Sequence, residues 1–133
     1  MITLLTGKKG TGKTKKLIEL ANAAVAADKG SVVVLEKGSK LTYDIDHGAR
    51  LINVDDYAVK GEAELKGFIC GILAGNYDIT DIFVDSTLKV VDAADLEALV
   101  TGIAPAAKET NIVLLVSLDN ADVPASLTNY IAE

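Results

Sequence analysis

The stretch Gly7 Lys8 Lys9 Gly10 Thr11 Gly12 Lys13 Thr14 decides the fold, because it places three glycines and three lysines between two differently patterned segments. Residues 1–6 form a short apolar and β-branched run that is typical of a buried strand. From Thr14 onward, apolar residues recur at helical spacing as far as Val25, and Gly30 suits a left-handed cap where this helix ends. The sequence therefore predicts a strand, a glycine-rich turn and a helix in succession.

The rest of the chain continues this alternation of strands and helices. Short apolar runs predict strands at residues 31–36, 50–54, 80–85 and 111–117. A helix is expected to start near Glu62, a second to be capped by Asp92 and to bend or end near Pro105, and a short last one to open at Pro124 and contain Leu127 and Ile131. Strands that are apolar throughout and separated by helices indicate a parallel sheet covered on both faces. The expected fold is thus α/β, a three-layer doubly wound sandwich with a mainly parallel sheet of four or five strands.

The composition predicts one domain over residues 1–133, since half of the residues are hydrophobic and 24% are charged. Acidic residues outnumber basic ones by 19 to 13, a balance that does not favour a broad nucleic-acid-binding face. No apolar run approaches the roughly 20 residues that span a bilayer, so we expect a cytoplasmic protein without membrane contact. With one cysteine, Cys70, and one histidine, His47, an internal disulfide and a zinc-ligand cluster are excluded, and we expect Cys70 in the core and His47 in a loop.

Positive charge is concentrated in the glycine-rich stretch, which fits the pattern G-x-x-x-x-G-K-[ST] at every fixed position. Its glycines allow backbone N–H groups to turn inward around a β-phosphate, and the following helix adds the positive end of its dipole. We expect Lys13 to reach the β- and γ-phosphates and the Thr14 hydroxyl to bind Mg²⁺. The expected nucleotide-binding residues of this stretch are Gly7, Lys8, Lys9, Gly10, Thr11, Gly12, Lys13, Thr14 and Lys15.

With this loop between a strand and a helix, the chain resembles the P-loop NTPase superfamily. A second motif supports the resemblance, because the apolar run Ile82 Phe83 Val84 ends in Asp85 as a Walker B strand does. The resemblance implies that Asp85 holds Mg²⁺, mostly through water. Ser86 follows, so the Asp-Glu pair that supplies a base in many P-loop ATPases is missing.

The RecA-like branch of that superfamily takes its water-activating glutamate from the end of the strand after the P-loop helix, a position that Glu36 matches. Parallel strands gather their carboxyl ends at one edge, so Glu36, Asp85 and the loop are expected to face one crevice. The alternative for Glu36 is a solvated carboxylate beside Lys37. For a residue that senses the γ-phosphate, Ser117 is the first candidate and Asn120 the second, the alternative being ordinary turn residues.

The leading functional hypothesis is a small RecA-like protein that binds Mg-ATP and hydrolyses it slowly, with Lys13 and Glu36 as catalytic residues and Thr14 and Asp85 at the metal. ATP is favoured over GTP because no Asn-Lys-x-Asp signature occurs. One alternative is a nucleoside or small-molecule kinase, since residues 114–124 loosely resemble thymidine-kinase-like proteins, although a four-cysteine zinc lid and an arginine pair are missing.

A further alternative is an ATP-dependent switch or assembly protein without useful turnover. A homo-oligomer or a protein partner stays open, because Arg50, the single arginine, fits either a finger that enters a neighbouring subunit's site or a surface charge.

Overall fold

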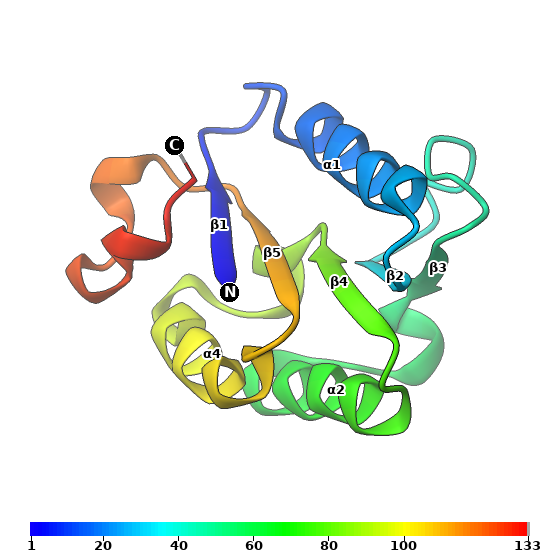
Figure 1. The fold of residues 1–133 in the computed structure, drawn as a ribbon. Coiled ribbons are helices and arrows are strands. Elements are labelled where there is room, and N and C mark those ends of the chain that lie inside the picture. Colours follow the sequence, from blue (N-terminus) through cyan, green and yellow to red (C-terminus); the bar gives the residue numbers. More distant parts are fainter. Residues whose placement is uncertain (133) are drawn as a thin grey trace.

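The computed structural model describes residues 1–132, which form an α/β fold around one five-stranded sheet. All strand pairs are parallel, and the order across the sheet is β1-β5-β4-β2-β3 (Figure 1). The strands are β1 (Ile2–Thr6), β2 (Ser31–Glu36), β3 (Arg50–Asn53), β4 (Ile79–Val84) and β5 (Asn111–Val116). The sequence predicted a mainly parallel sheet of four or five strands. This prediction is confirmed, and the sheet has five strands.

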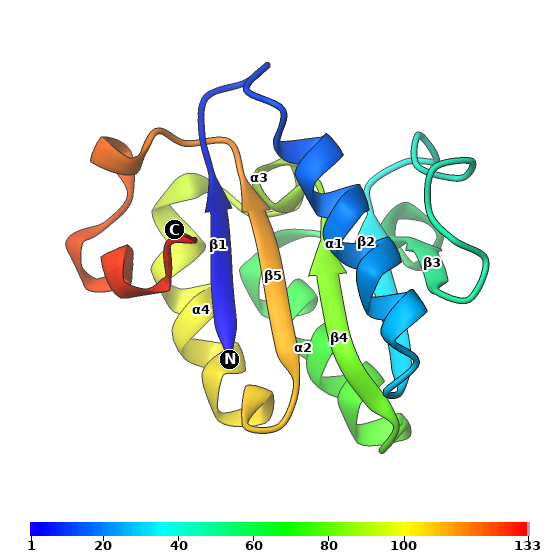
Figure 2. The same ribbon diagram turned by 45° about the horizontal axis from the view of Figure 1, so that its top comes forward.

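Helices cover both faces of the sheet, so the molecule has three layers. Helix α1 (Lys13–Ala27) lies on one face, and α2 (Gly61–Gly75) and α4 (Leu96–Ile103) lie side by side on the other (Figure 1). Strand side chains alternate between the two faces, because Leu4 belongs to the core cluster that includes α2 and α4 whereas Leu5 packs with α1. The short helix α3 (Thr87–Val90) lies near the edge at which the strands end (Figure 2).

The end of α1 differs from the prediction. Asp28, with φ of 50°, is the left-handed cap, and its N–H donates to the Val25 carbonyl oxygen at 3.1 Å. Aspartate tolerates this conformation better than most residues with a side chain, so the cap lies two residues before Gly30. Gly30 is needed for space instead, because a Cβ at that position would collide with the Asp78 carbonyl oxygen.

Two other helix predictions also need correction. Asp92 does not cap α4: it precedes the one-turn 3-10 helix Ala93–Asp95 and makes no side-chain capping hydrogen bond, while α4 begins at Leu96. The predicted end near Pro105 is confirmed, because α4 ends at Ile103 and a 3-10 turn follows. The last segment, Ala125–Tyr130, is a 3-10 helix, and Ile131 lies beyond it in a bridge to Leu4.

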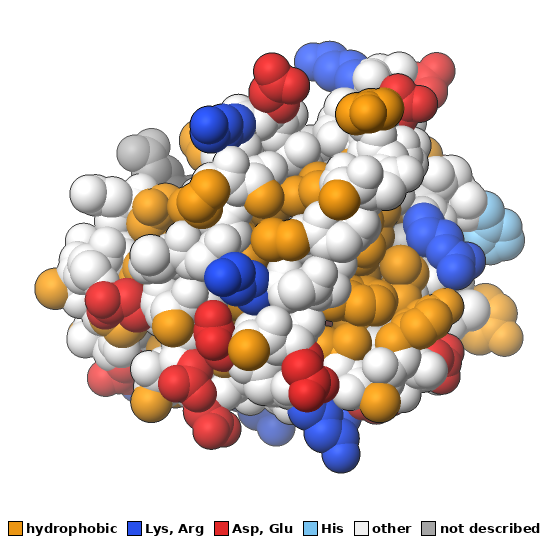
Figure 3. Space-filling model, turned by 90° about the horizontal axis from the view of Figure 1, so that it is seen from below, with side chains coloured by type: hydrophobic (Ala, Val, Ile, Leu, Met, Phe, Trp, Pro, Cys, Tyr) orange, Lys and Arg blue, Asp and Glu red, His pale blue; other side chains and the backbone are white. Residues whose placement is uncertain are grey.

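The outer surface of α2 and α4 mixes apolar and charged side chains (Figure 3). Phe68, Ile72 and Leu73 of α2 are half-buried and pack against the core, and Cys70 is half-buried as well, so it lies at the margin of the core rather than inside it. Among residues 1–132, no helix combines the length and the apolar character needed to cross a membrane.

Candidate functional site

The candidate site lies at the carboxyl edge of the sheet, where residues 7–14 connect β1 to α1 (Figure 2). Strand β5 separates β1 from β4, so Ser117 follows a strand that lies between this loop and Asp85. A cavity of about 570 Å³ opens at this edge. The residues that line it are Lys9, Gly10, Gly12, Lys13, Thr14, Lys40, Asp85, Ser86, Thr87, Leu88, Lys89, Leu115 and Ser117.

The backbone of the 7–14 loop depends on glycine. Gly10 and Gly12 have φ of 85° and 84°, in the left-handed region that a Cβ disfavours. A Cβ at either position would meet no atom within 4 Å, so the backbone conformation is the reason for glycine there. Successive turns of this kind direct N–H groups into a concave surface that suits an anion.

The amino end of α1 adds free donors to this surface. The first N–H groups of a helix have no partner inside it, and here the first bond back to the loop runs from the Lys16 N–H to the Gly12 carbonyl oxygen at 3.1 Å. No side chain caps this end, and no acidic residue lies in the first turn of α1. The helix therefore offers unpaired N–H groups and positive dipole potential at the cavity.

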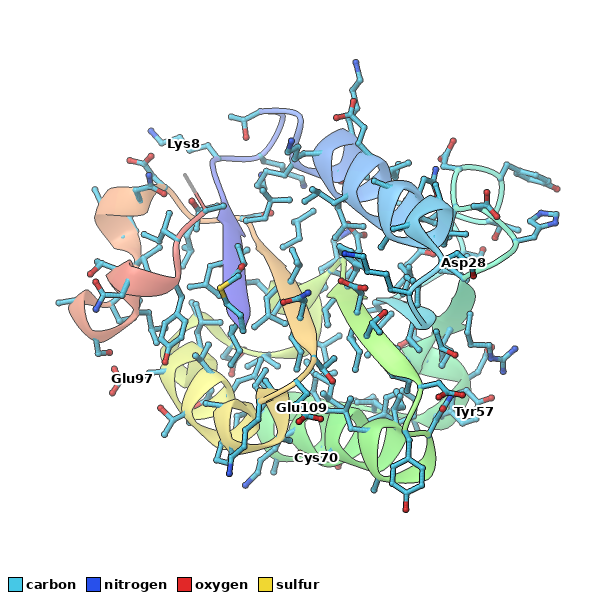
Figure 4. All side chains as sticks on the ribbon, viewed as in Figure 1. Lys8, Asp28, Tyr57, Cys70, Glu97 and Glu109 are labelled. Atoms are coloured by element: carbon cyan, nitrogen blue, oxygen red, sulfur yellow. The ribbon has the colours of Figure 1, made fainter. Side chains whose placement is uncertain are left out.

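Lys13 lies across the loop. Its side chain is buried, 8% exposed, and its Nζ donates to the Lys8 carbonyl oxygen at 2.7 Å. The Thr11 hydroxyl donates to the same oxygen at 2.7 Å. The side chain of Lys8 points away from α1 (Figure 4), and neither it nor Lys15 lines the cavity. Lys8 thus contributes its carbonyl group to the loop, and Lys13 holds an ammonium group at the cavity.

Asp85 reaches the cavity from the end of β4. Its N–H donates to the Leu35 carbonyl oxygen at 2.9 Å, and its Oδ2 accepts from the Ser86 hydroxyl at 3.1 Å. Its Oδ1 is buried and has no hydrogen-bond partner among residues 1–132. An unpaired buried carboxylate oxygen is unfavourable, so this atom favours a nearby cation or a bound donor.

The residues around Asp85 fit Mg²⁺. Asp85 and the exposed hydroxyl of Thr14 line the same cavity and offer the oxygen ligands that this ion takes. No group of three or more His, Cys, Asp or Glu that could hold a metal occurs within residues 1–132. Magnesium at this site would therefore need water and phosphate oxygens as further ligands, which is its usual coordination with nucleotides.

Glu36 lies beside the cavity rather than on its surface. The side chain is 2% exposed, and its Oε1 accepts from the N–H groups of Lys40 at 2.7 Å and Leu41 at 3.1 Å. It lines a separate cavity of about 380 Å³, which is also lined by His47. The carboxylate thus closes the turn over residues 37–41, and its role in activating water stays a prediction.

The other predicted residues divide into two groups. Ser117 is exposed and lines the cavity, as a γ-phosphate sensor requires. Asn120 accepts a hydrogen bond from the Thr6 hydroxyl and so ties the end of β1 to the segment after β5. Arg50 is exposed at the amino end of the edge strand β3 and does not line the cavity. Any role for Arg50 at a site of this kind would have to be in a neighbouring molecule.

Sequence reasoning missed Lys40 and Lys89. Each follows the carboxyl end of a parallel strand, four residues after the acidic residue that ends it, Glu36 or Asp85. Both line the cavity, together with Lys9 and Lys13. Asp85 is the one carboxylate in that lining, so the cavity is strongly cationic in a chain of formal net charge -6.

A comparison of the chain with protein-family models found no match, and neither did a comparison with curated proteins. The chemistry of the cavity therefore carries the functional argument. A backbone anion cradle, four lysines and one carboxylate with an unpaired oxygen can bind a polyanion together with a hard cation.

Proposed function

We propose that the protein is a P-loop nucleotide-binding protein of the RecA-like kind, which binds Mg-ATP and hydrolyses it slowly. The observation that carries the proposal is the shared cavity, which is lined by Lys13 of the 7–14 loop and by Asp85, whose buried Oδ1 has no hydrogen-bond partner among residues 1–132. A phosphate chain would pair with the lysines of that cavity, and a divalent cation would pair with the Asp85 carboxylate.

The phosphates would bind to the cradle at the start of α1. Backbone N–H groups around Gly10 and Gly12 and the free N–H groups of α1 would hold the β-phosphate. The Lys13 ammonium carries three donors and uses one on the Lys8 carbonyl, so it can turn donors toward β- and γ-phosphate oxygens. The cradle therefore provides both directed hydrogen bonds and charge.

Thr14 and Asp85 would hold the metal, Thr14 through its hydroxyl and Asp85 mostly through water. When bound, Mg²⁺ neutralises charge that develops on the phosphate oxygens during transfer. Ser117, which follows β5 between these two elements, would donate its hydroxyl to the γ-phosphate. The chain's own residues thus orient the triphosphate for attack at the γ-phosphorus.

Hydrolysis joins a water oxygen to the γ-phosphorus and breaks the bond from that phosphorus to the β–γ bridging oxygen, with loss of a water proton. Glu36 is the predicted acceptor of this proton. Its carboxylate already accepts the N–H groups of Lys40 and Leu41 and lies beside the cavity rather than on its surface, which accords with slow turnover.

The switch alternative, which binds ATP without useful turnover, has one specific observation in its favour. Asp85 is the one carboxylate that lines the cavity, and it is assigned to the metal. A site without a free base can hold a triphosphate for a long time. Binding with no phosphate release at any protein concentration would select this alternative over the ATPase.

The kinase alternative rests on the cavity of about 380 Å³ beside Glu36, whose mixed lining includes Ser39, Thr42 and Asn53. Hydroxyl and amide groups of this kind suit a hydroxylated acceptor. Transfer of phosphate to an added nucleoside, in place of its release to water, would select the kinase.

The test of the proposed function measures Mg-ATP and Mg-GTP binding by titration calorimetry, and phosphate release with and without added nucleosides. We expect ATP to bind more tightly than GTP, to bind only weakly without Mg²⁺, and to release phosphate slowly. Absence of binding by either nucleotide would overturn the assignment.

A further inference from the structure

We propose that Lys40 and Lys89 bind the terminal phosphate from the β2 and β4 side of the cavity, and that Glu36 is the positioning residue for Lys40. The chain would then supply by itself the charge that many phosphoryl-transfer sites take from an arginine. The inference rests on the proposed function and deepens it, because it names what distinguishes a triphosphate from a diphosphate at this site.

Lys40 has a fixed backbone and a free side chain. Its N–H and that of Leu41 donate to the buried Glu36 carboxylate, which closes the turn after β2. Leu41 is 3% exposed and packs in the core cluster under α1, so the turn is anchored on that side as well. The Lys40 residue itself is exposed and lines the cavity.

Lys89 is held in a comparable way in α3, which follows β4, the strand next to β2 in the sheet. Its N–H donates to the Ser86 carbonyl oxygen at 2.9 Å, one turn back in α3. Thr87, in the same turn, is fully buried and holds the helix against the protein. Lys89 is exposed and lines the cavity four residues after Asp85.

Neither lysine forms an ion pair with another side chain in the described part of the chain, residues 1–132. The one ion pair among residues 1–132 joins Lys37 to Asp55 at 2.7 Å. Asp55 is therefore paired with Lys37, and neither Lys40 nor Lys89 has an acidic partner within residues 1–132. A phosphate group is the ligand that suits two unpaired ammonium groups at one cavity.

The positions of Lys40 and Lys89 in the cavity determine which phosphate group these two lysines would reach. The cradle and Lys13 belong to β1 and α1, which hold the β-phosphate in the proposed mode, whereas Lys40 and Lys89 follow β2 and β4 on the far side of β5. A phosphate chain that extends from the cradle toward Asp85 brings its terminal group to these two lysines. They would therefore contact a triphosphate but not a diphosphate.

The experiment measures, by titration calorimetry, the affinities for Mg-ADP and for the non-hydrolysable triphosphate Mg-AMP-PNP. We expect Lys40→Ala and Lys89→Ala each to weaken Mg-AMP-PNP binding about tenfold and to leave Mg-ADP binding within about twofold. Lys40→Arg should keep most of the triphosphate affinity. Lys108→Ala is the matched control, since Lys108 precedes β5 at the opposite edge of the sheet.

A double-mutant cycle tests Glu36. Alone, Glu36→Gln should weaken Mg-AMP-PNP binding about fivefold, because an amide holds the Lys40 and Leu41 N–H groups less strongly than a carboxylate does. In the Lys40→Ala background the same substitution should add almost nothing, since the cation that Glu36 positions is gone. A purely structural role would give equal losses in both backgrounds, and for both nucleotides.

The outcomes separate the inference from the proposed function. If wild type binds neither nucleotide, both are overturned. If wild type binds both and Lys13→Ala abolishes binding, the nucleotide site stands. In that case the inference is overturned when Lys40→Ala and Lys89→Ala behave like Lys108→Ala, or when they weaken Mg-ADP and Mg-AMP-PNP equally.

Discussion

Two cavities of similar size lie at opposite ends of β1, and they differ in chemistry. The one at the amino end, about 710 Å³, is the larger and is lined by Met1, Ile2, Thr3, Ala104, Ala107, Asn129, Tyr130, Ile131 and Ala132. Its one charged group, the amino terminus, already donates to the carbonyl oxygens of Ala107 and Thr110. The one at the carboxyl end, about 570 Å³, is lined by four lysines and by Asp85, one of whose carboxylate oxygens is buried and has no partner among residues 1–132. Unsatisfied polar groups, rather than volume, therefore single out the carboxyl-end cavity as the candidate site.

The largest effect is expected for Lys13→Ala, and this substitution tests whether the carboxyl-end cavity binds the nucleotide. Lys13→Ala removes the one buried ammonium of the loop, and we expect Mg-ATP affinity to fall about a hundredfold or more. The fold should survive, because Lys13 contacts the loop backbone and belongs to neither core cluster. Calorimetry measures the affinity, and circular dichroism checks the fold. Unchanged affinity in a folded variant would rule out this cavity.

The next effect compares two glycines. Gly12→Ala forces a Cβ into a left-handed conformation, so we expect the free energy of unfolding to fall by about 1–2 kcal/mol and Mg-ATP affinity to drop about tenfold as the cradle shifts. Gly67→Ala is the control, because Gly67 lies inside α2 and a Cβ there meets nothing within 4 Å. It should raise the free energy of unfolding by about 0.5–1 kcal/mol and leave binding unchanged. Denaturant titration measures both changes. If Gly12→Ala and Gly67→Ala changed stability and affinity equally, neither property would depend on the left-handed backbone of Gly12.

Asp85→Asn should separate stability from metal binding. An amide is neutral and less costly to bury unpaired, so the free energy of unfolding should stay the same or rise by about 1 kcal/mol. The Mg²⁺ concentration needed for half-maximal ATP binding should rise about tenfold, because the hard cation loses an anionic partner. Titrating Mg²⁺ at fixed ATP measures this. A loss of stability with an unchanged Mg²⁺ curve would make Asp85 a structural residue.

The sequence predicted the sheet well because most residues of β2, β4 and β5 are buried, and a short apolar run such as residues 112–116 is typical of such a strand. It also predicted the turn between β1 and α1, because three glycines stand between a strand pattern and a helix pattern, while the phosphate chemistry of this loop stays a prediction. It placed the cap of α1 at Gly30 because glycine is the commoner left-handed residue, whereas chain geometry selected Asp28.

The rest of the site depends on three-dimensional relations that the sequence does not express. Lys40 and Lys89 lie 49 positions apart in the chain and meet one cavity only because β2 and β4 are neighbours in the sheet. The hydrogen bonds of Glu36 likewise depend on how residues 37–41 turn back over the strand end. A glutamate at the end of a strand is compatible with catalysis, with solvent exposure and with closing a turn, and the backbone decides among them.

The smallest expected effect contrasts two lysines of the same loop. Lys8 contributes a carbonyl oxygen to Lys13 and Thr11, while its side chain points away from α1 (Figure 4). Lys8→Ala keeps that carbonyl, so we expect Mg-ATP affinity to change by about twofold or less at physiological salt, where exposed charges are largely screened. The residual effect should disappear at high salt, whereas the loss in Lys13→Ala should persist because its ammonium is buried against the loop. Calorimetry at two salt concentrations measures both variants. A tenfold loss in Lys8→Ala that salt does not reduce would mean that the Lys8 side chain turns inward and contacts the phosphates directly, and the distinction between backbone and side-chain roles in this loop would fail.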